Sequence, residues 1–238
     1  MTRESEPVFF YSLPQNVHLA VASKRPVPAG ESYPPEFYDR IASSVHRLDA
    51  CVGSFVDELK RRQLYDDSIL ILTSDHGDSL GEEGRWGHAY YMYPEVMRVP
   101  LIVHLPSWLK NDVRADTKAV AFTADITPSL YALLGYHPAD LGPLFGRPLF
   151  TARDADPAPR RDANFLLASS YGAVYGILRH DGRDLYVVDA VDGEDYAFDL
   201  SGPPRRIDPS PAMTSENRKL IAGELAALAA TYGVTSAR

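Results

Sequence analysis

Cysteine is almost absent from this chain of 238 residues, in which Cys51 is the single one. One cysteine excludes an internal disulfide and leaves the redox compartment undetermined. Long apolar runs are also missing, because none approaches the roughly 20 residues that a membrane helix needs. Arg3, Glu4 and Glu6 interrupt any apolar core at the start of the chain, so we expect no signal peptide there.

Basic clusters are scarce as well. The net charge is -8, and the longest basic run is Lys60-Arg61-Arg62. This balance argues against a nucleic-acid partner, because such binding rests on a basic face that neutralises phosphates. With 45% hydrophobic residues, the chain has the composition of a globular protein. Its length allows one sizeable domain, or one domain with a small appendage.

Apolar periodicity predicts strands and helices in the first part of the chain. Over 35–63, apolar residues recur at three- and four-residue steps, which is typical of an amphipathic helix packed on a sheet. The continuous apolar run at 69–72 is typical of a strand buried on both faces of a parallel sheet. We expect Asp125 to cap a later helix and Gly135 to end it. The other elements expected here are a strand over 8–13, a strand over 99–105 and that helix over 125–134.

The last part of the chain has a different pattern. Residues 151–163 are rich in proline and charge and predict a linker. Short β-branched and aromatic runs follow, with Asp-Gly turns at 181–182 and 192–193, which predicts a small antiparallel sheet. Its strands are expected over 164–170, 174–179, 185–189 and 196–200, before a final helix over 215–232. The expected division is an α/β part over 1–150, the linker, and the small sheet with its helix over 164–238.

The motif with the clearest chemistry follows the strand at 69–72, which ends in Ser74-Asp75-His76-Gly77. Ligands of open α/β sheets bind at the carboxyl ends of the strands, so Asp75 and His76 lie where a site is expected. One carboxylate oxygen and one imidazole nitrogen suit Zn²⁺ or Mn²⁺ better than Ca²⁺. The alternative is an aspartate that caps a turn beside a polar histidine.

The run from Ser68 to Pro106 contains this strand, a loop of the form GEEG…WGH, and an RVPLI strand at 98–102. In order and spacing it resembles the metal-binding segment of the sulfatases and their relatives in the alkaline phosphatase superfamily. The resemblance implies an α/β fold with a sulfatase-like sheet flanked by helices, followed by a small C-terminal antiparallel sheet plus helix. It also points to an extracytoplasmic or periplasmic location.

The resemblance gives roles to four residues. Asp75 and His76 are expected to hold a divalent metal ion, either Zn, Mn or Ca. His88 and His18 are expected to bind the substrate by holding an anionic ester oxygen, and His88 has a second metal as an alternative. Many sulfatases carry a lysine near the position of His88, whereas phosphoethanolamine- and glycerophosphate-transferring relatives carry a histidine. From the residues alone, a loop histidine at 88 and a structural histidine at 18 remain alternatives.

Other polar residues receive a structural interpretation. Asp78, Glu82 and Glu83 are expected to form a solvated loop, with support of His76 by Asp78 as the alternative. Cys51 lies on the predicted helix without the C/S-x-P-x-R pattern of a sulfatase nucleophile. The segment from Ser201 to Arg205 fits that pattern, but it comes after the metal pair, so we interpret it as a turn.

No nucleophile and no earlier carboxylate ligand precede Asp75, so the sequence resembles the C-terminal half of a sulfatase-like enzyme. The favoured hypothesis is a portion of a metal-dependent hydrolase of sulfate or phosphate esters that supplies metal and anion ligands. The alternatives are a non-catalytic binding or structural module and a phosphoethanolamine or glycerophosphate transferase. The expected partners are an ester substrate and either an N-terminal half or a second copy. Alone, the chain is expected to be inactive and to bind metal weakly, because two ligands leave a tetrahedral site half filled.

Overall fold

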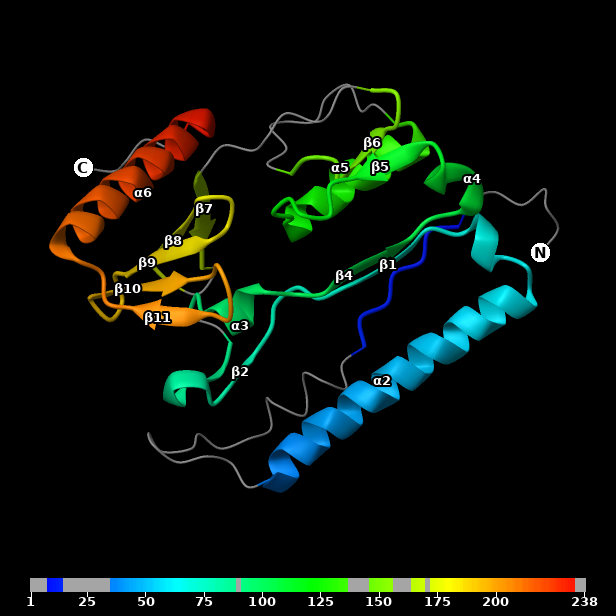
Figure 1. Ribbon diagram of the computed structural model, residues 1–238, viewed down its shortest axis with the longest axis horizontal. Coiled ribbons are helices and arrows are strands. Elements are labelled where there is room, and N and C mark those ends of the chain that lie inside the picture. The colour runs from blue at the N-terminus through cyan, green and yellow to red at the C-terminus, as the bar shows by residue number, and fades with distance from the viewer. Residues whose placement is uncertain are drawn as a thin grey trace. The chain divides into compact units, whose positions relative to one another are not determined.

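The structure is a computed structural model that describes residues 8–14, 35–88, 91–136, 146–155, 164–169 and 172–233 (Figure 1). The chain divides into two compact units. The first unit comprises Met1–Tyr65 and Leu80–Gly87, and the second comprises Asp66–Ser79 and His88–Arg238. Within the described part of the chain, no helix has the length and apolarity needed to cross a membrane.

A long helix dominates the first unit. Helix α2, Pro35–Arg61, confirms the helix predicted over 35–63. It places the acidic Glu36 in its first turn and Lys60 in its last, as the helix dipole favours. Its N-terminal half buries Phe37, and Tyr38 donates a hydrogen bond to the carbonyl of Leu80, at 3.1 Å. The short elements β2, η2 and β3 follow it, at Ser79–Leu80, Glu82–Gly84 and Trp86–Gly87.

The strand predicted over 8–13 does not form. Its apolar side chains are 56–81% exposed, and the described residues give it no strand to pair with. Its Phe10 ring contacts the ring of Phe55 of α2, with centroids 6.3 Å apart. An apolar extended segment becomes a strand only when a neighbour takes up its backbone hydrogen bonds, so the prediction was wrong here.

The strands around the metal motif pair with each other. Strand β1, Leu70–Thr73, lies antiparallel to β4, Leu101–His104, as a two-stranded sheet. Both strands were predicted, but the parallel arrangement buried on both faces was not correct for this pair. Leu72 is 39% exposed and Ile102 is 60% exposed. The apolar run alone could not specify the direction of the neighbouring strand.

A small helical region follows β4. The helix predicted over 125–134 is α5, Ile126–Leu134, and it ends at Gly135 in the left-handed conformation, with φ 71°. The short elements in this region are α4 Ser107–Lys110, β5 Val113–Ala115, η3 Thr123–Asp125 and β6 Phe150–Ala152, of which β5 and β6 pair antiparallel. The short helix η1, Tyr65–Asp67, comes earlier in the chain, between α2 and β1. Strand β6 therefore occupies the first residues of the predicted linker, whose residues 156–163 lie outside the described part.

Asp125 is fully buried, but it does not cap α5 with its side chain as predicted. Its carboxylate instead accepts hydrogen bonds from the backbone N–H groups of Phe122 and Arg147, both at 2.8 Å. Ser129 adds a second link, because its hydroxyl accepts from the N–H of Leu149 at 2.7 Å. These two side chains link the segment before β6 to α5. Contacts between residues so far apart in the sequence cannot be predicted from local patterns.

The predicted C-terminal sheet is confirmed, with one strand more than expected. Its order is β11-β10-β9-β8-β7, and every neighbouring pair is antiparallel. The φ angles of Gly182 and Gly193, 80° and 74°, fit the two predicted Asp-Gly turns. The elements are β7 Asn164–Ala168, β8 Val174–Arg179, β9 Asp184–Asp189, β10 Glu194–Asp199, β11 Arg205–Ile207 and α6 Pro211–Thr231.

Helix α6 covers one face of this sheet. Ser210 caps it by accepting a hydrogen bond from the N–H of Met213, at 3.3 Å. Ile221 of α6 packs against Ile177 and Tyr186 in a buried cluster. A second cluster joins residues of the segment around α3, Pro94–Met97, to strands β8, β9 and β10. This second cluster leads to the candidate site.

Candidate metal centre

The loop from Ser74 to Ser79, here called the metal loop, follows β1 directly. Its first turn is closed by two local hydrogen bonds. The Ser74 hydroxyl donates to the carbonyl of His76 at 2.6 Å, and the N–H of His76 donates to Asp75 Oδ1 at 3.1 Å. Asp75 and His76 are therefore presented together at the end of β1, as the sequence predicted.

Gly77 sets how closely the metal loop approaches α3. Its N–H donates to the carbonyl of Val96 at 2.7 Å. A Cβ atom at this position would lie 2.1 Å from the carbonyl oxygen of Glu95, so no other residue fits without a shift of the backbone. The buried Ser79 adds a further link, because its hydroxyl donates to Glu95 Oε1 at 2.7 Å. The metal loop is thus fixed on α3 at two points.

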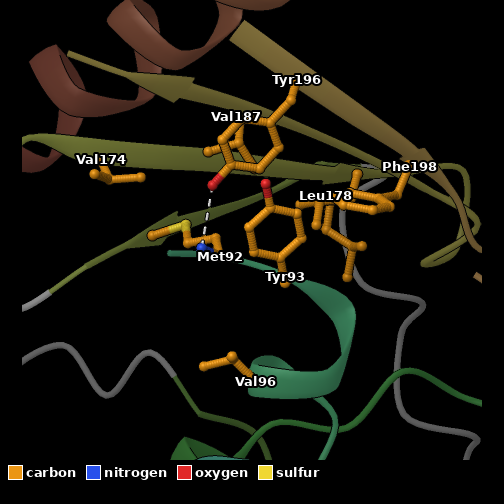
Figure 2. Packing of buried hydrophobic residues seen from close by; sticks show 9 residues of the cluster. Met92, Tyr93, Val96, Val174, Leu178, Val187, Tyr196 and Phe198 are labelled. Atoms are coloured by element: carbon orange, nitrogen blue, oxygen red, sulfur yellow. Dashed lines mark hydrogen bonds between the residues drawn. The ribbon is translucent and has the colours of Figure 1, made fainter. Parts of the chain in front are cut away.

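The segment that contains α3 is in turn fixed on the C-terminal sheet, as Figure 2 shows. The N–H of Met92 donates to the hydroxyl of Tyr196 at 3.2 Å. The ring of Tyr93 stacks on that of Tyr196, with centroids 5.2 Å apart and planes 6° from parallel. Phe198 meets Tyr93 edge-on at the same centroid distance. Tyr93 and Val96 are buried, so the C-terminal sheet supports the α3 segment, on which the metal loop is fixed.

His76 is held in a form that suits metal binding. Its Nδ1 lies 2.9 Å from the carbonyl oxygen of Gly77. A carbonyl oxygen only accepts, so Nδ1 carries the proton and Nε2 presents its lone pair. Nε2 lies 3.8 Å from Asp75 Oδ2, whose side chain is 72% exposed.

His88 lies beside His76, although eleven residues separate them in the chain. The two imidazole rings stack with centroids 3.8 Å apart. Nδ1 of His88 contacts Asp78 Oδ1 at 2.7 Å, and these two side chains are only 20% and 17% exposed. Asp78 is therefore not part of a solvated loop, which corrects that expectation, whereas Glu82 and Glu83 are exposed. The Asp78 carboxylate contacts the ring of His88, whereas the expected alternative was support of His76.

The donors gathered here fit a divalent ion. One ligand atom each from His76, Asp78 and His88 lie within 4.8 Å of one another. Asp75 offers a further carboxylate beside Nε2 of His76. Imidazole nitrogens with carboxylate oxygens are a ligand set of Zn²⁺ and Mn²⁺. Asp78 was not predicted as part of this cluster, because its position beside His88 depends on the path of the chain between them.

The remaining candidates from the sequence lie elsewhere. His18 is outside the described residues. Cys51 is exposed on α2. Ser201 lies in the turn between β10 and β11, where its hydroxyl donates to Asp199 Oδ1 at 2.6 Å. Hydrogen bonds from the Ser201 side chain and backbone, together with Arg205, lower the pKa of Asp199 to about 2. These contacts close a turn, and the site described above does not include Ser201.

The fold and the metal loop together define an α/β protein with a carboxylate–histidine pair at the end of a strand. The chain belongs to the sulfatase family, because the family model described as Sulfatase matches residues 1–136. The resemblance noted from the segment between Ser68 and Pro106 is thereby confirmed at the level of the family.

Known proteins resemble this chain in sequence or in fold. An N-acetylglucosamine-6-O-sulfatase of Bacteroides thetaiotaomicron is 26% identical over 172 residues, which are 70% of this chain and 30% of that protein. A choline-sulfatase of Rhizobium meliloti is 33% identical over 93 residues, which are 39% of this chain and 17% of that protein. The crystal structure of a putative sulfatase from Bacteroides thetaiotaomicron superposes with a TM-score of 0.60 at 16% identity. That superposition covers 96% of this chain and 53% of the other, so this chain matches only part of the length of its relatives.

Proposed function

We propose that this chain supplies the metal and anion ligands of a metal-dependent hydrolase that acts on sulfate or phosphate esters. The observation that carries the proposal is the Asp75–His76 pair, whose Oδ2 and Nε2 atoms lie 3.8 Å apart at the end of β1. Membership of the sulfatase family supports sulfate esters as the first substrate class. The relatives' names support a sulfate ester too, since both are called sulfatases.

Each residue has a defined task in this proposal. Asp75 and His76 hold the ion through a carboxylate oxygen and Nε2. A bound divalent ion supplies positive charge that stabilises the charge developing on the ester oxygens. His88 and His18 hold the anionic oxygens of the sulfate or phosphate group, because an imidazole N–H donates to such oxygens. None of these residues is assigned as the nucleophile.

A transferase is the second candidate, and His88 is the observation that favours it. By resemblance, a histidine at this position is found in relatives that transfer phosphoethanolamine or glycerophosphate, where many sulfatases carry a lysine. A non-catalytic module is the third candidate, because no nucleophile is assigned in this chain. The coding DNA upstream of Met1 separates these cases. A strand with a carboxylate ligand and a Cys, Ser or Thr nucleophile there supports an enzyme.

Calorimetric titration of the purified chain with inorganic sulfate and phosphate tests the proposed ligands. We expect either anion to bind only when Zn²⁺ or Mn²⁺ is present, and His88→Ala to weaken that binding. His46→Gln, an exposed histidine on α2, is the matched control. Without an assigned nucleophile, the loaded chain should not turn over 4-nitrophenyl sulfate. Anion binding that is the same without metal, or that survives His76→Gln with Asp75→Asn, contradicts the proposal.

A further inference from the structure

A pocket on the C-terminal sheet contains polar residues that the proposed function does not use. Its volume of about 430 Å³ lies within the range of about 300–1,000 Å³ that is usual for ligand sites. The lining comes from the turn between β8 and β9, the start of β9, the end of β10, the turn after it and β11. None of it belongs to the metal loop or to α3. The polar lining residues are His180, Arg183, Asp184, Asp199, Ser201 and Arg205.

The sheet holds the polar groups of this pocket in fixed positions. Asp184 of β9 lies opposite Asp199 of β10, and Asp199 lies opposite Arg205 of β11. Residues that lie directly opposite each other in antiparallel strands project to the same face. The N–H of Leu200 also donates to the carbonyl of Arg183 at 2.6 Å, which joins the turn after β8 to the end of β10. Groups that are fixed before a ligand arrives lower the entropic cost of binding it.

The two carboxylates of the pocket repel each other across the strands, and each has a partner that offsets this repulsion. Asp184 contacts Nδ1 of His180 through Oδ2. Asp199 accepts a hydrogen bond from the Ser201 hydroxyl at 2.6 Å and another from Nη2 of Arg205 at 3.1 Å. An ionised carboxylate has about four acceptor sites, so the Asp184 carboxylate in particular can accept further hydrogen bonds. The pocket therefore offers acceptors to hydroxyl groups.

Arg183 and Arg205 bring donors that these contacts do not exhaust. A guanidinium has five N–H donors. Nε of Arg183 donates to the carbonyl of His180 at 3.0 Å, and Arg205 donates to Asp199 through Nη2. The two side chains are 64% and 71% exposed, so a ligand from solvent can reach the N–H groups that these bonds leave. A planar guanidinium binds carboxylate or sulfate oxygens through two parallel hydrogen bonds.

We propose that this pocket binds an acidic sugar, meaning a sugar ring that carries one carboxylate or sulfate group. The acid group lies between Arg183 and Arg205, and hydroxyl groups of the ring donate to the Asp184 carboxylate. Ile207, which packs against the hydrophobic cluster next to α6, is the apolar lining residue on which the C–H face of the ring rests. Among the described lining residues none is aromatic, which argues against a nucleobase as the ligand.

The mixture of donors and acceptors decides between an acidic sugar and simpler ligands. Inorganic sulfate has no hydroxyl to donate at neutral pH, and the carboxylates of Asp184 and Asp199 repel it. A neutral sugar donates to the carboxylates but brings no negative charge to Arg183 and Arg205. An acidic sugar satisfies both sets of groups. Because no residue of the metal loop takes part, this binding needs no metal ion.

The test is a calorimetric titration of the full chain in EDTA with glucuronic acid and with glucose 6-sulfate. Glucose and inorganic sulfate are the reference ligands. We expect one acidic sugar to bind per chain, at least about tenfold more tightly than either reference, because a hydrogen-bonded charge is worth about that factor. EDTA keeps the candidate metal centre empty, so anion binding of the kind proposed above does not contribute.

Variants assign the binding to the pocket. Arg183→Gln and Arg205→Gln should each raise the Kd for glucose 6-sulfate about tenfold. Asp184→Asn should weaken the acidic sugar but strengthen inorganic sulfate, an opposite pair of changes that a general loss of structure does not give. Arg61→Gln is the matched control, because Arg61 is 68% exposed and pairs with the carboxylate of Glu58 on α2. Thermal unfolding checks each variant, and if Arg205→Gln unfolds, Arg183→Gln decides.

Each outcome bears on this inference separately from the proposed function. Equal affinities for inorganic sulfate and glucose 6-sulfate would reduce the pocket to a simple anion site and overturn the inference. Absence of saturable sugar binding, or binding that is unchanged in both arginine variants, overturns it as well. Neither result affects the metal-dependent anion binding proposed above. Sugar binding in EDTA that is lost in the arginine variants supports the inference, even if the metal titrations of the chain fail.

Discussion

At the scale of single residues, Gly77 controls the approach of the metal loop to α3. Gly77→Ala would place a Cβ 2.1 Å from the carbonyl oxygen of Glu95. We expect it to lower the free energy of unfolding by about 1–3 kcal/mol, the usual cost of overpacking. Because the loop must move, Zn²⁺ affinity should fall as well. Urea unfolding and calorimetry measure the two effects.

Gly223→Ala is the matched control for this substitution. Gly223 lies within α6 and has no atom within 4 Å of its added Cβ. Alanine there should raise the free energy of unfolding by about 0.5–1 kcal/mol, because glycine is the more flexible residue in a helix. If Gly77→Ala behaved like this control, the metal loop would not be held on α3 as described.

Single residues also show what the sequence could and could not predict about the site. Asp75 and His76 were found from their position at the end of a strand, and the structure presents them there. The place of His88 beside His76 depends on the path of the chain between them, which no local pattern specifies. Asp78 was expected to be solvated. Its burial depends on that same path of the chain, so local sequence could not predict it. The roles of all four remain predictions.

At the scale of elements, a charged contact fastens α6 to the C-terminal sheet. Arg218 of α6 donates two hydrogen bonds to the carboxylate of Asp195, each at 2.7 Å, and Tyr186 donates to the same carboxylate. Arg218→Met leaves the Asp195 carboxylate, only 9% exposed, without its cation. We expect this variant to unfold at a lower urea concentration at neutral pH, because hydrogen bonds to charged groups stabilise more than neutral ones, although solvent screening reduces the effect at the partly exposed Arg218.

The pH dependence of this contact follows from the lowered pKa of Asp195. Burial raises this pKa, but the hydrogen bonds from Arg218 and Tyr186 outweigh it. A carboxylate whose pKa is lower in the folded protein stabilises it above its ordinary pKa of 3.8 and loses that effect as the pH falls below it. The stability difference between the native chain and Arg218→Met should therefore shrink below about pH 4 in urea unfolding. A difference that stayed constant down to pH 2 would contradict this account.

Elements differed in how well they could be predicted. Helix α2 and the strands joined by Asp-Gly turns were predicted, because periodicity and turn chemistry are local signals. The antiparallel direction of β1 relative to β4 was not predicted, because strand pairing is decided by residues that are distant in the sequence. Strand β11 was missed, since its three residues follow two prolines and carry little pattern of their own.

At the scale of the whole molecule, each unit leaves apolar side chains exposed. Leu72 and Ile102 of the β1–β4 sheet are 39% and 60% exposed, and Val45 and Phe55 of α2 are 49% and 47% exposed. Apolar faces and unpaired strand edges of this kind promote association. We therefore expect the purified chain to form dimers or larger species. Light scattering measures this, and Leu72→Thr with Ile102→Thr should reduce it, whereas a clean monomer at high concentration would contradict the prediction.

The central claim is that the segment from Asp75 to His88 holds a divalent metal ion. The most direct measurement follows the histidine ring signals of the chain by NMR while Mn²⁺ is added in small amounts, since this paramagnetic ion broadens the signals of nearby nuclei. The account predicts that the signals of His76 and His88 disappear first, while those of His46, His104 and His180 persist. Equal broadening of all five, or earlier loss of the His180 signal, would contradict it.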